Sequence, residues 1–393
     1  MREFDWQPRT RLVYGAGALA RLGELAAGLG LRRVLIVTDA GIVQAGHVAH
    51  AEESLQAANV ATAVFSGVHE NPDTEDVAAC LAVAQDFGCD GFVGLGGGSA
   101  MDTAKGANFL LTNGGEVRDY WRTHNATKPL LPLIAVPTTA GTGSEVQCHA
   151  LIADAATHAK MAIGDPKATP VIALLDPELT LSLPLAVTAN VGIDALVHAL
   201  EAWVTKPRNP VSNLFAKEAF TLLLPNFKRV LLEPGDLEAR GAMLLGAAYA
   251  GHAIESSMLG AAHSAANPLT AHFGVVHGQA VGRMLPHVIR FNAQEPSVRA
   301  LYEALLPLET LLEELESGLN LAGFPTSLAE YGVTDNAIPT LAAEAVAQWT
   351  ASFNPRLIAA ADFEVLYRAA LTPPLEGGVN RRKRHNGRGG HPS

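Results

Sequence analysis

The order of the predicted strands and helices constrains this fold most. Up to about residue 185, short runs rich in β-branched residues alternate with segments of helical periodicity. The runs that we expect to form strands are 32–39, 60–67, 90–98, 129–139 and 169–177. Segment 74–88 has a strong helical pattern and segment 42–55 a weaker one. Because strand–helix–strand repeats build parallel sheets covered by helices, we predict an α/β fold for this half.

The second half has a different pattern. Long Ala- and Leu-rich stretches of helical periodicity occupy 194–205, 213–232, 236–254 and several segments after 297, and strand signals nearly vanish. We therefore predict an α/β domain over residues 1–185 and an all-helical domain over residues 186–372. A cleft between two domains is a favoured place for a small-molecule site. Residues 373–393 are predicted to form a disordered basic tail, with a nucleic-acid arm as the alternative.

Composition excludes several classes of protein. Hydrophobic residues make up 48% of the 393 residues and charged residues 17%, which excludes global disorder. The net charge of −11 argues against nucleic acid as the main partner. Three cysteines without CxxC spacing predict neither a disulfide framework nor a thiolate metal site. Without a signal-peptide pattern or an unbroken apolar run long enough to cross a bilayer, the chain is expected to be soluble and cytoplasmic.

Two glycine-containing loops follow predicted strands. In the first, the strand over 90–98 ends in three glycines, Gly96 to Gly98, and a helix follows with Ser99 as a candidate cap. Glycines allow close backbone approach and a helix start attracts anions, so we favour phosphate binding over an ordinary βα turn. In the second loop, 137–145, threonine hydroxyls stand beside glycines, which suits a pyrophosphate or ribose; the alternative is a polar turn.

Asp39 ends the predicted strand 32–39. A carboxylate at this position can bind the ribose hydroxyls of an adenine nucleotide and repel a 2′-phosphate. The alternative role, a helix N-cap, is equally consistent with the sequence.

Asp194 and His198 lie four residues apart in an apolar run, so they share one face of a helix. His263 and His277 follow in another apolar stretch, which we expect to be a helix broken at Pro268. One carboxylate and three imidazoles form a plausible ligand set for a divalent metal. The alternative is that these are satisfied core residues, as His252, His272 and His287 could also be.

The motifs together resemble the iron-containing (group III) alcohol dehydrogenase family. The resemblance is carried by GGGSAMDTAK, PTTAGTGSE, KMAIGDPK…DPELTLSLP, GIDALVHALEAW and HSAANPL…HGQAVGRMLPHVIRFN, and it touches FNPR at 353–356. It implies a Rossmann-like parallel sheet followed by an all-α domain, the dehydroquinate synthase-like two-domain architecture. It also implies a homodimer or larger homo-oligomer.

The resemblance assigns roles to individual residues. It implies that Fe(II), with Zn(II) as the alternative, is held by Asp194, His198, His263 and His277. It implies that NAD is bound by residues of the two loops and of the 160–184 segment: Gly97, Gly98, Ser99, Asp102, Thr138, Thr139, Thr142, Lys160 and Leu179. Asp39 falls where members that favour NAD over NADP often carry an acid.

The sequence departs from the family at the proton-relay position. Many members have a histidine four residues after the third metal ligand, and this chain has Asn267 there. An amide can orient a water or a substrate oxygen but cannot take a proton at neutral pH. His272 is the candidate substitute, and a packed residue is its alternative role.

The predicted function is metal-dependent hydride transfer between a small primary alcohol or diol and NAD(H). The alternatives are a hydroxyacid–oxoacid transhydrogenase, a maleylacetate reductase-like enzyme and, from a different class, a catalytically silent NAD-binding protein. We expect a small alcohol or aldehyde as substrate, and neither nucleic acid nor a membrane as partner.

Overall fold

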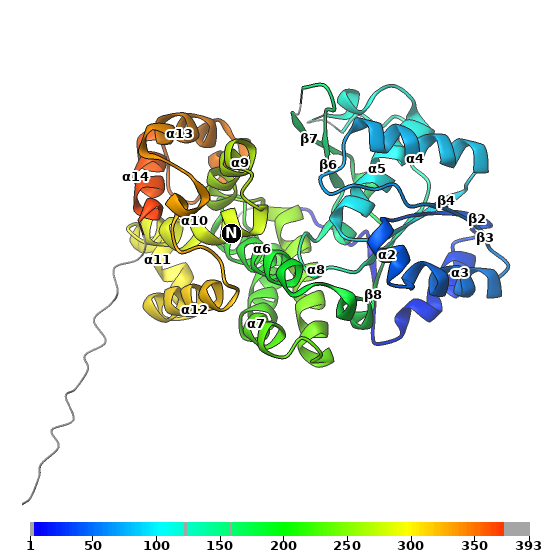
Figure 1. The fold of residues 1–393 in the computed structure, drawn as a ribbon, viewed down its shortest axis with the longest axis horizontal. Helices are drawn as coiled ribbons and strands as arrows, with labels where there is room; N and C mark the ends of the chain where they lie inside the picture. Colours follow the sequence, from blue (N-terminus) through cyan, green and yellow to red (C-terminus); the bar gives the residue numbers. More distant parts are fainter. Residues whose placement is uncertain (1–3, 122–123, 158, 373–393) are drawn as a thin grey trace, which may run out of the picture.

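The computed structural model describes residues 4–121, 124–157 and 159–372, and these form a sheet-containing region beside a helical region (Figure 1). A six-stranded parallel sheet has the order β1-β8-β5-β4-β2-β3. Its strands are β1 (Arg11–Tyr14), β2 (Arg33–Val37), β3 (Ala61–Phe65), β4 (Gly91–Gly96), β5 (Leu133–Pro137) and β8 (Ile172–Leu175). The predicted fold class, a parallel α/β region followed by a helical one, is confirmed.

Alternating side chains divide the sheet into two apolar faces. Val34 and Ile36 pack on the face covered by α1 (Leu22–Gly28), α2 (Ala40–Gln44) and α3 (His47–Ala57). Leu35 and Val37 pack on the face covered by α4 (Thr74–Phe87) and α5 (Gly98–Asn113). Strands buried on both faces are almost continuously apolar, which is why the central strands were predictable.

Three local features differ from the sequence prediction. The edge strand β1 was not predicted, because four residues with only Val13 buried give no clear pattern. The weak helix over 42–55 is two helices, since Gly46 between them has a φ of 83°. An antiparallel hairpin of β6 (His149–Ala153) and β7 (Lys160–Gly164) was also not predicted. Short 3-10 turns lie at Ala18–Arg21 (η1), Val117–Tyr120 (η2), Ser144–Val146 (η3), Pro166–Ala168 (η4) and Pro177–Ser182 (η5).

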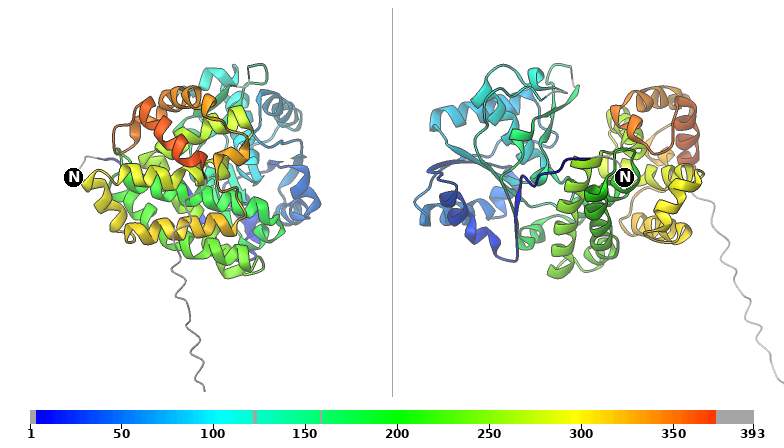
Figure 2. Two further views of the ribbon diagram at one scale, coloured as in Figure 1. Left: turned by 60° about the vertical axis from the view of Figure 1, so that its left-hand side comes forward. Right: turned by 180° about the vertical axis from the view of Figure 1, so that it is seen from behind.

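The helical region surrounds a central buried helix, α6 (Leu185–Val204). The other helices are α7 (Pro210–Leu232), α8 (Leu237–Ser257), α9 (Ala261–Phe273), α10 (His277–Asn292), α11 (Pro296–Glu303), α12 (Leu308–Leu321), α13 (Ile338–Ala347) and α14 (Ala360–Leu371). Short turns η6 (Leu328–Tyr331), η7 (Asp335–Ala337) and η8 (Trp349–Phe353) join the last of them. Seen from behind, the N-terminal segment runs along this region before it enters β1 (Figure 2). Trp6 of that segment lies 6.0 Å, between ring centroids, from Phe215 of α7.

The predicted break at Pro268 is wrong. Helix α9 continues through Pro268 and ends at Phe273, followed by Gly274 with a φ of 64°. Glycine adopts this left-handed conformation without the steric cost that a Cβ brings, so it ends the helix where the proline does not. Two residues later, α10 begins at His277.

Helix α6 corrects the expectation that no segment is apolar and long enough to cross a membrane. By length and composition it would suffice, although 72% of its most apolar window is buried inside the molecule. The core helix of a soluble protein has the same properties, so this is weak support for a membrane span. We propose that the two domains divide between residues 185 and 186, where α6 begins. The predicted basic tail, 373–393, lies outside the described residues.

Candidate metal and nucleotide site

Four side chains from three helices converge at the centre of the helical region. Asp194 and His198 project from one face of α6, His263 comes from α9, and His277 is the first residue of α10. Asp194 Oδ1 lies 3.4 Å from His198 Nε2, 3.4 Å from His263 Nε2 and 3.7 Å from His277 Nε2. A single carboxylate oxygen thus faces one nitrogen of each imidazole.

This arrangement fits a divalent cation. Asp194, His263 and His277 each place a ligand atom within 4.8 Å of the others, and His198 approaches the same carboxylate oxygen. Within the described residues, Asp194 Oδ1 and His263 Nε2 are buried without a hydrogen-bond partner. Burying such atoms unsatisfied is costly, and a bound metal would satisfy both. The mixed carboxylate and imidazole set suits Fe(II) or Zn(II).

Glu201, which was not among the predicted site residues, orients His263. Glu201 Oε2 accepts a hydrogen bond from His263 Nδ1 at 2.7 Å. Its carboxylate also accepts from the backbone N–H groups of Ala262 at 2.7 Å and Gly260 at 2.9 Å, which fixes the start of α9. With Nδ1 engaged, Nε2 is left facing Asp194. The signal was present: Glu201 follows His198 by three residues, so it lies on nearly the same helical face.

Burial and mutual charge set the protonation of the cluster. Burial alone would lower the pKa of His263, but Glu201 and Asp194 outweigh it and raise the pKa to about 9. Burial lowers the pKa of His277 to about 3 and also lowers that of His198. Burial would raise the pKa of Asp194, but the surrounding imidazoles outweigh it, so the carboxyl stays ionised. The cluster therefore contains the ionised carboxylate of Asp194, which the Nε2 atoms of the three imidazoles face.

The two glycine-containing loops lie side by side at the carboxyl edge of the sheet. Gly96 pairs with Pro137 in the β4–β5 ladder, and the Thr138 N–H donates to the Gly96 carbonyl at 2.9 Å. A Cβ on Gly98 would meet Thr142 Oγ1 at 2.9 Å, and one on Gly97 would meet Thr139 at 3.4 Å. A side chain at Gly98 would therefore clash with Thr142, so this glycine lets the two loops pack together at the start of α5, whereas the contact at Gly97 is an ordinary one.

Ser99, the candidate cap of α5, is not its cap. The helix begins at Gly98 and its N-cap is Gly97, so Ser99 lies inside the first turn. Because Gly97 has no side chain, it does not occupy the N–H groups at the helix start as a serine cap would. That end of α5 keeps the donors that an anion would use.

Asp39 is the N-cap of α2. Its Oδ1 accepts hydrogen bonds from the N–H groups of Gly41 at 2.8 Å and Ile42 at 3.1 Å. Its Oδ2 lies on the side of the glycine loop, 3.6 Å from where a Cβ on Gly96 would be. The capping role is therefore present, and the second oxygen is placed beside the predicted nucleotide loop; ribose binding stays a prediction.

A buried charge network fixes the second loop. Lys105 Nζ donates to the Ser144 carbonyl and to Ser144 Oγ, both at 2.7 Å, and to the His149 carbonyl at 2.9 Å. Ser144 Oγ donates to Asp102 Oδ1 at 2.7 Å, and Asp102 Oδ2 accepts from the Leu151 N–H at 2.9 Å. Both oxygens of Asp102 are thus engaged by the protein, which favours a positioning role. Lys105 was not among the predicted site residues, although a lysine three residues after an aspartate in an apolar helix indicates a buried pair.

The remaining predicted cofactor residues have different surroundings. Lys160, the first residue of β7, donates to Asn71 Oδ1 at 3.2 Å. Desolvation lowers the pKa of Lys160, while the carboxylates of Asp102 and Asp194 oppose that shift. The Lys160 ammonium group therefore interacts electrostatically with Asp102 beside the second loop and with Asp194 of the metal cluster. Leu179 is buried in the core on the α1 and α3 face of the sheet.

The two candidate relay residues pair with other side chains. His272 Nε2 lies 2.8 Å from Glu344 Oε2, and both side chains are 43% exposed. Asn267 Nδ2 donates to Gln348 Oε1 at 3.1 Å. These contacts make His272 part of an exposed ion pair, which fits neither a packed core residue nor a residue that faces the metal cluster, and the relay role stays a prediction.

The second glycine-containing loop, 137–145, and the metal cluster meet on α6. A Cβ on Gly141 would clash with Val191, at 2.5 Å from its Cβ and 2.9 Å from its carbonyl oxygen. The loop backbone therefore rests directly on α6, and Val191 precedes Asp194 by three residues, less than one helical turn.

Two sequence profiles cover most of the chain. The profile described as iron-containing alcohol dehydrogenase matches residues 8–177, and the profile for the C-terminal part of the Fe-containing alcohol dehydrogenase family matches residues 188–371. The chain belongs to the iron-containing alcohol dehydrogenase family. The predicted family is confirmed, and with it the class of enzyme.

Relatives of this family member align over almost their whole length. It is 33% identical over 376 residues to an NAD-dependent methanol dehydrogenase of Bacillus methanolicus, covering 91% of this chain and 97% of the relative. It is 32% identical over 389 residues to a 1,3-propanediol dehydrogenase of Klebsiella pneumoniae, covering 94% and 99%. A solved 1,3-propanediol oxidoreductase superposes with a TM-score of 0.89 at 32% identity, covering 94% of this chain and 100% of that chain.

Proposed function

We propose that this chain is a metal-dependent, NAD(H)-linked alcohol dehydrogenase that acts on a small primary alcohol or diol, or on the corresponding aldehyde. The observation that carries the proposal is the contact between Gly141 and Val191. It brings the second glycine-containing loop, 137–145, to within one helical turn of Asp194 on α6. The relatives named for NAD, methanol and 1,3-propanediol support the same cofactor and a short alcohol as substrate.

The side chains of the cluster have distinct roles in this proposal. Asp194, His198, His263 and His277 would hold Fe(II), or Zn(II), and a cation bound there would supply Lewis-acid polarisation of the alcohol or carbonyl oxygen. Glu201 keeps His263 Nδ1 engaged so that Nε2 stays available. Asp194 supplies the negative charge that offsets part of the cation's charge.

The sheet edge would hold the dinucleotide, whose nicotinamide supplies the hydride chemistry. The N-terminus of α5, with Gly97, Gly98 and Ser99, would bind the pyrophosphate through backbone N–H groups. Asp39 Oδ2 would accept hydrogen bonds from the adenosine ribose. Thr138, Thr139 and Thr142 would line the other side of the pyrophosphate, while Asp102 and Lys105 keep their loop in place through Ser144.

The convergence of all four predicted ligands favours this function over two of its three alternatives. A maleylacetate reductase-like enzyme does not need the complete metal set, and a silent NAD-binding protein needs none. A hydroxyacid–oxoacid transhydrogenase would keep both sites, and only a cofactor that stays bound through turnover would distinguish it. We also propose a cytoplasmic homodimer or larger assembly; the three free cysteines are consistent with a reducing compartment.

Metal analysis combined with an NAD-linked screen of short alcohols, diols and aldehydes tests the proposal. We expect the native protein to retain iron or zinc and to reduce NAD⁺ with at least one short alcohol, and His263→Ala to lose both properties. His287→Gln is the control, since it changes a half-buried imidazole of α10 that does not belong to the cluster. Normal turnover in a metal-stripped sample would refute the proposal, and NADH binding without oxidation of any alcohol by metal-loaded protein would favour the silent protein.

A further inference from the structure

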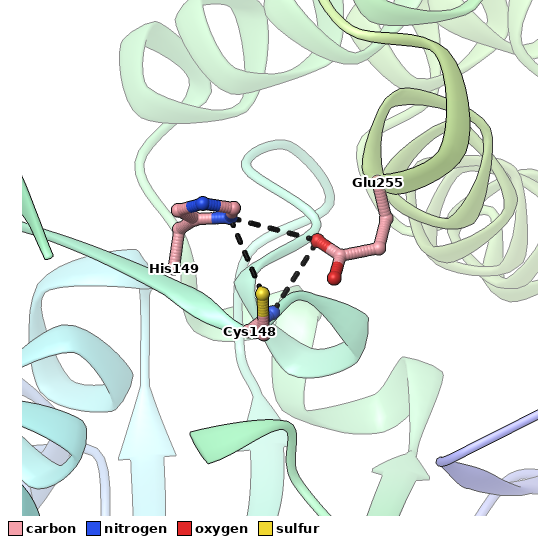
Figure 3. Close-up of side chains that lie close together, drawn as sticks. All are labelled: Cys148, His149 and Glu255. Carbon is pink, nitrogen blue, oxygen red and sulfur yellow. Dashed lines mark hydrogen bonds and ion pairs between the residues drawn. The ribbon is translucent and has the colours of Figure 1, made fainter. Parts of the chain in front are cut away.

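A second group of potential metal ligands lies between the two regions of the molecule. Cys148 and His149 stand at the start of β6, and Glu255 reaches them from α8 (Figure 3). Cys148 Sγ lies 3.5 Å from His149 Nδ1, and His149 Nδ1 lies 3.7 Å from Glu255 Oε2. One ligand atom of each residue lies within 4.8 Å of the others. None of the three belongs to the predicted metal or nucleotide residues.

The geometry is that of ligands around one point and not that of a proton relay. In a nucleophilic triad, the thiol and the carboxylate contact opposite nitrogens of the imidazole. Here both approach the same atom, His149 Nδ1 (Figure 3). Tetrahedral zinc, with Zn–S of about 2.3 Å and Zn–N of about 2.0 Å, requires ligand-to-ligand distances of roughly 3.5 Å, close to the two observed.

The three atoms have few competing partners among the described residues. Glu255 Oε2 accepts a long hydrogen bond from the Cys148 backbone N–H at 3.4 Å. Arg9 Nη1 lies 4.0 Å from the other carboxylate oxygen, Oε1. Lys105 approaches His149 only through its backbone carbonyl. The His149 ring lies against Gly164 of β7, where a Cβ would meet its Cδ2 at 2.5 Å, so a glycine is needed to leave room for the ring.

The cluster is accessible from one side. Cys148 is 3% exposed, whereas the His149 side chain is 37% exposed and that of Glu255 15%. A metal could therefore enter past the imidazole and keep a water as its fourth ligand. Burial, with a further contribution from Glu255, raises the pKa of the Cys148 thiol, so binding would release the thiol proton to solvent.

We propose that Cys148, His149 and Glu255 form a second divalent-metal site, of the zinc class, that links β6 to α8 across the two regions of the molecule. Thiolate, imidazole and carboxylate together select Zn²⁺ and its neighbours Co²⁺ and Ni²⁺ over the hard cations Mg²⁺ and Ca²⁺. The site is distinct from the Asp194 cluster, which contains no thiolate.

Cobalt(II) provides a direct test, because only a thiolate ligand gives intense sulfur-to-cobalt charge-transfer absorption in the near ultraviolet. We expect reduced native protein, titrated anaerobically with Co²⁺ until both metal sites are filled, to develop this absorption with an amplitude of one thiolate-bound cobalt per chain. Cys148→Ser should lose the absorption but still bind cobalt at the Asp194 cluster. Cys89→Ser, which removes the more accessible of the other two cysteines, should keep it.

A second variant guards against misfolding of the first. Glu255→Gln keeps the thiol and should weaken the cobalt affinity read from the charge-transfer absorption by about tenfold or more. The proposal is overturned if native protein gives no charge-transfer absorption, or if the absorption survives in Cys148→Ser and disappears in Cys89→Ser. Because the readout is absorbance, it does not depend on the catalytic activity.

Discussion

Replacing Glu201 by glutamine should weaken metal binding while leaving the metal ligands themselves unchanged. Glu201 accepts hydrogen bonds from His263 Nδ1, the Ala262 N–H and the Gly260 N–H, all within 2.7 to 2.9 Å. The amide of glutamine has one accepting oxygen and an NH₂ group that cannot accept, so at least one of these donors loses its partner.

The magnitude follows from the charge that is lost. Hydrogen bonds to charged groups contribute about 1.5–3 kcal/mol each and neutral ones about 0.5–1.5 kcal/mol. Exchanging the charged acceptor for a neutral one weakens each of the three bonds by about 1 kcal/mol, so the free energy of unfolding should fall by roughly 3 kcal/mol. Loss of a partner that orients a metal-ligating histidine typically reduces metal affinity about 10–100-fold. We expect both effects in Glu201→Gln.

The assay is competition against a metal-buffering chelator, followed over a range of pH. In the native protein the pKa of His263 is raised to about 9, so below that pH the metal must displace a proton and the apparent affinity rises with pH. In Glu201→Gln this pKa falls, and the rise should level off at a lower pH. A purely structural change would weaken binding without moving that inflection.

Glu344→Gln is the matched control. Glu344 contacts His272 at 2.8 Å, much as Glu201 contacts His263 at 2.7 Å, but on an exposed surface. Exposed pairs contribute only about 0–1 kcal/mol, so this variant should keep native metal affinity and stability. Native metal affinity and an unchanged pH inflection in Glu201→Gln would refute the orienting role.

Three further predictions concern other residues. Asp39→Asn keeps an N-cap for α2 but removes the negative charge that repels a 2′-phosphate. The preference for NADH over NADPH, measured as the ratio of the two kcat/KM values, should therefore fall by about tenfold. An unchanged ratio would show that Asp39 only caps the helix. His272→Ala should leave the pH profile of kcat unaltered, since its imidazole pairs with Glu344 at the surface, and a lost ionisation would restore the relay role. Burial lowers the pKa of His252 and of His287 to about 4, so each contributes stability that is complete above pH 6.5 and is lost as pH falls towards 4. Urea unfolding should show a loss of up to about 3 kcal/mol for each group over this range, reduced in His287→Gln, and equal acid sensitivity in that variant would contradict the assignment.

Local patterns predicted much of the fold and part of the site. The strands β2, β4 and β5 are apolar because both faces of the sheet are covered, and α4 carries one buried stripe, so each is visible within its own segment. The pairing of Asp194 with His198 is equally local, since four residues make about one turn of a helix. The end of α9 was mispredicted because proline is the more obvious helix breaker, although the positive φ of Gly274 ends the helix.

The tertiary structure decided which distant residues meet. Periodicity within a segment cannot show that His263 and His277 face the same oxygen of Asp194, because their positions depend on how α9 and α10 pack on α6. The three cysteines without CxxC spacing argued against a thiolate site, yet the Cys148 thiol lies within 4.8 Å of ligand atoms of His149 and of Glu255, which is 107 residues further along the chain. Sequence determines local structure through spacing along one element. Contacts between elements depend on the packing of whole surfaces, and no short segment contains that information.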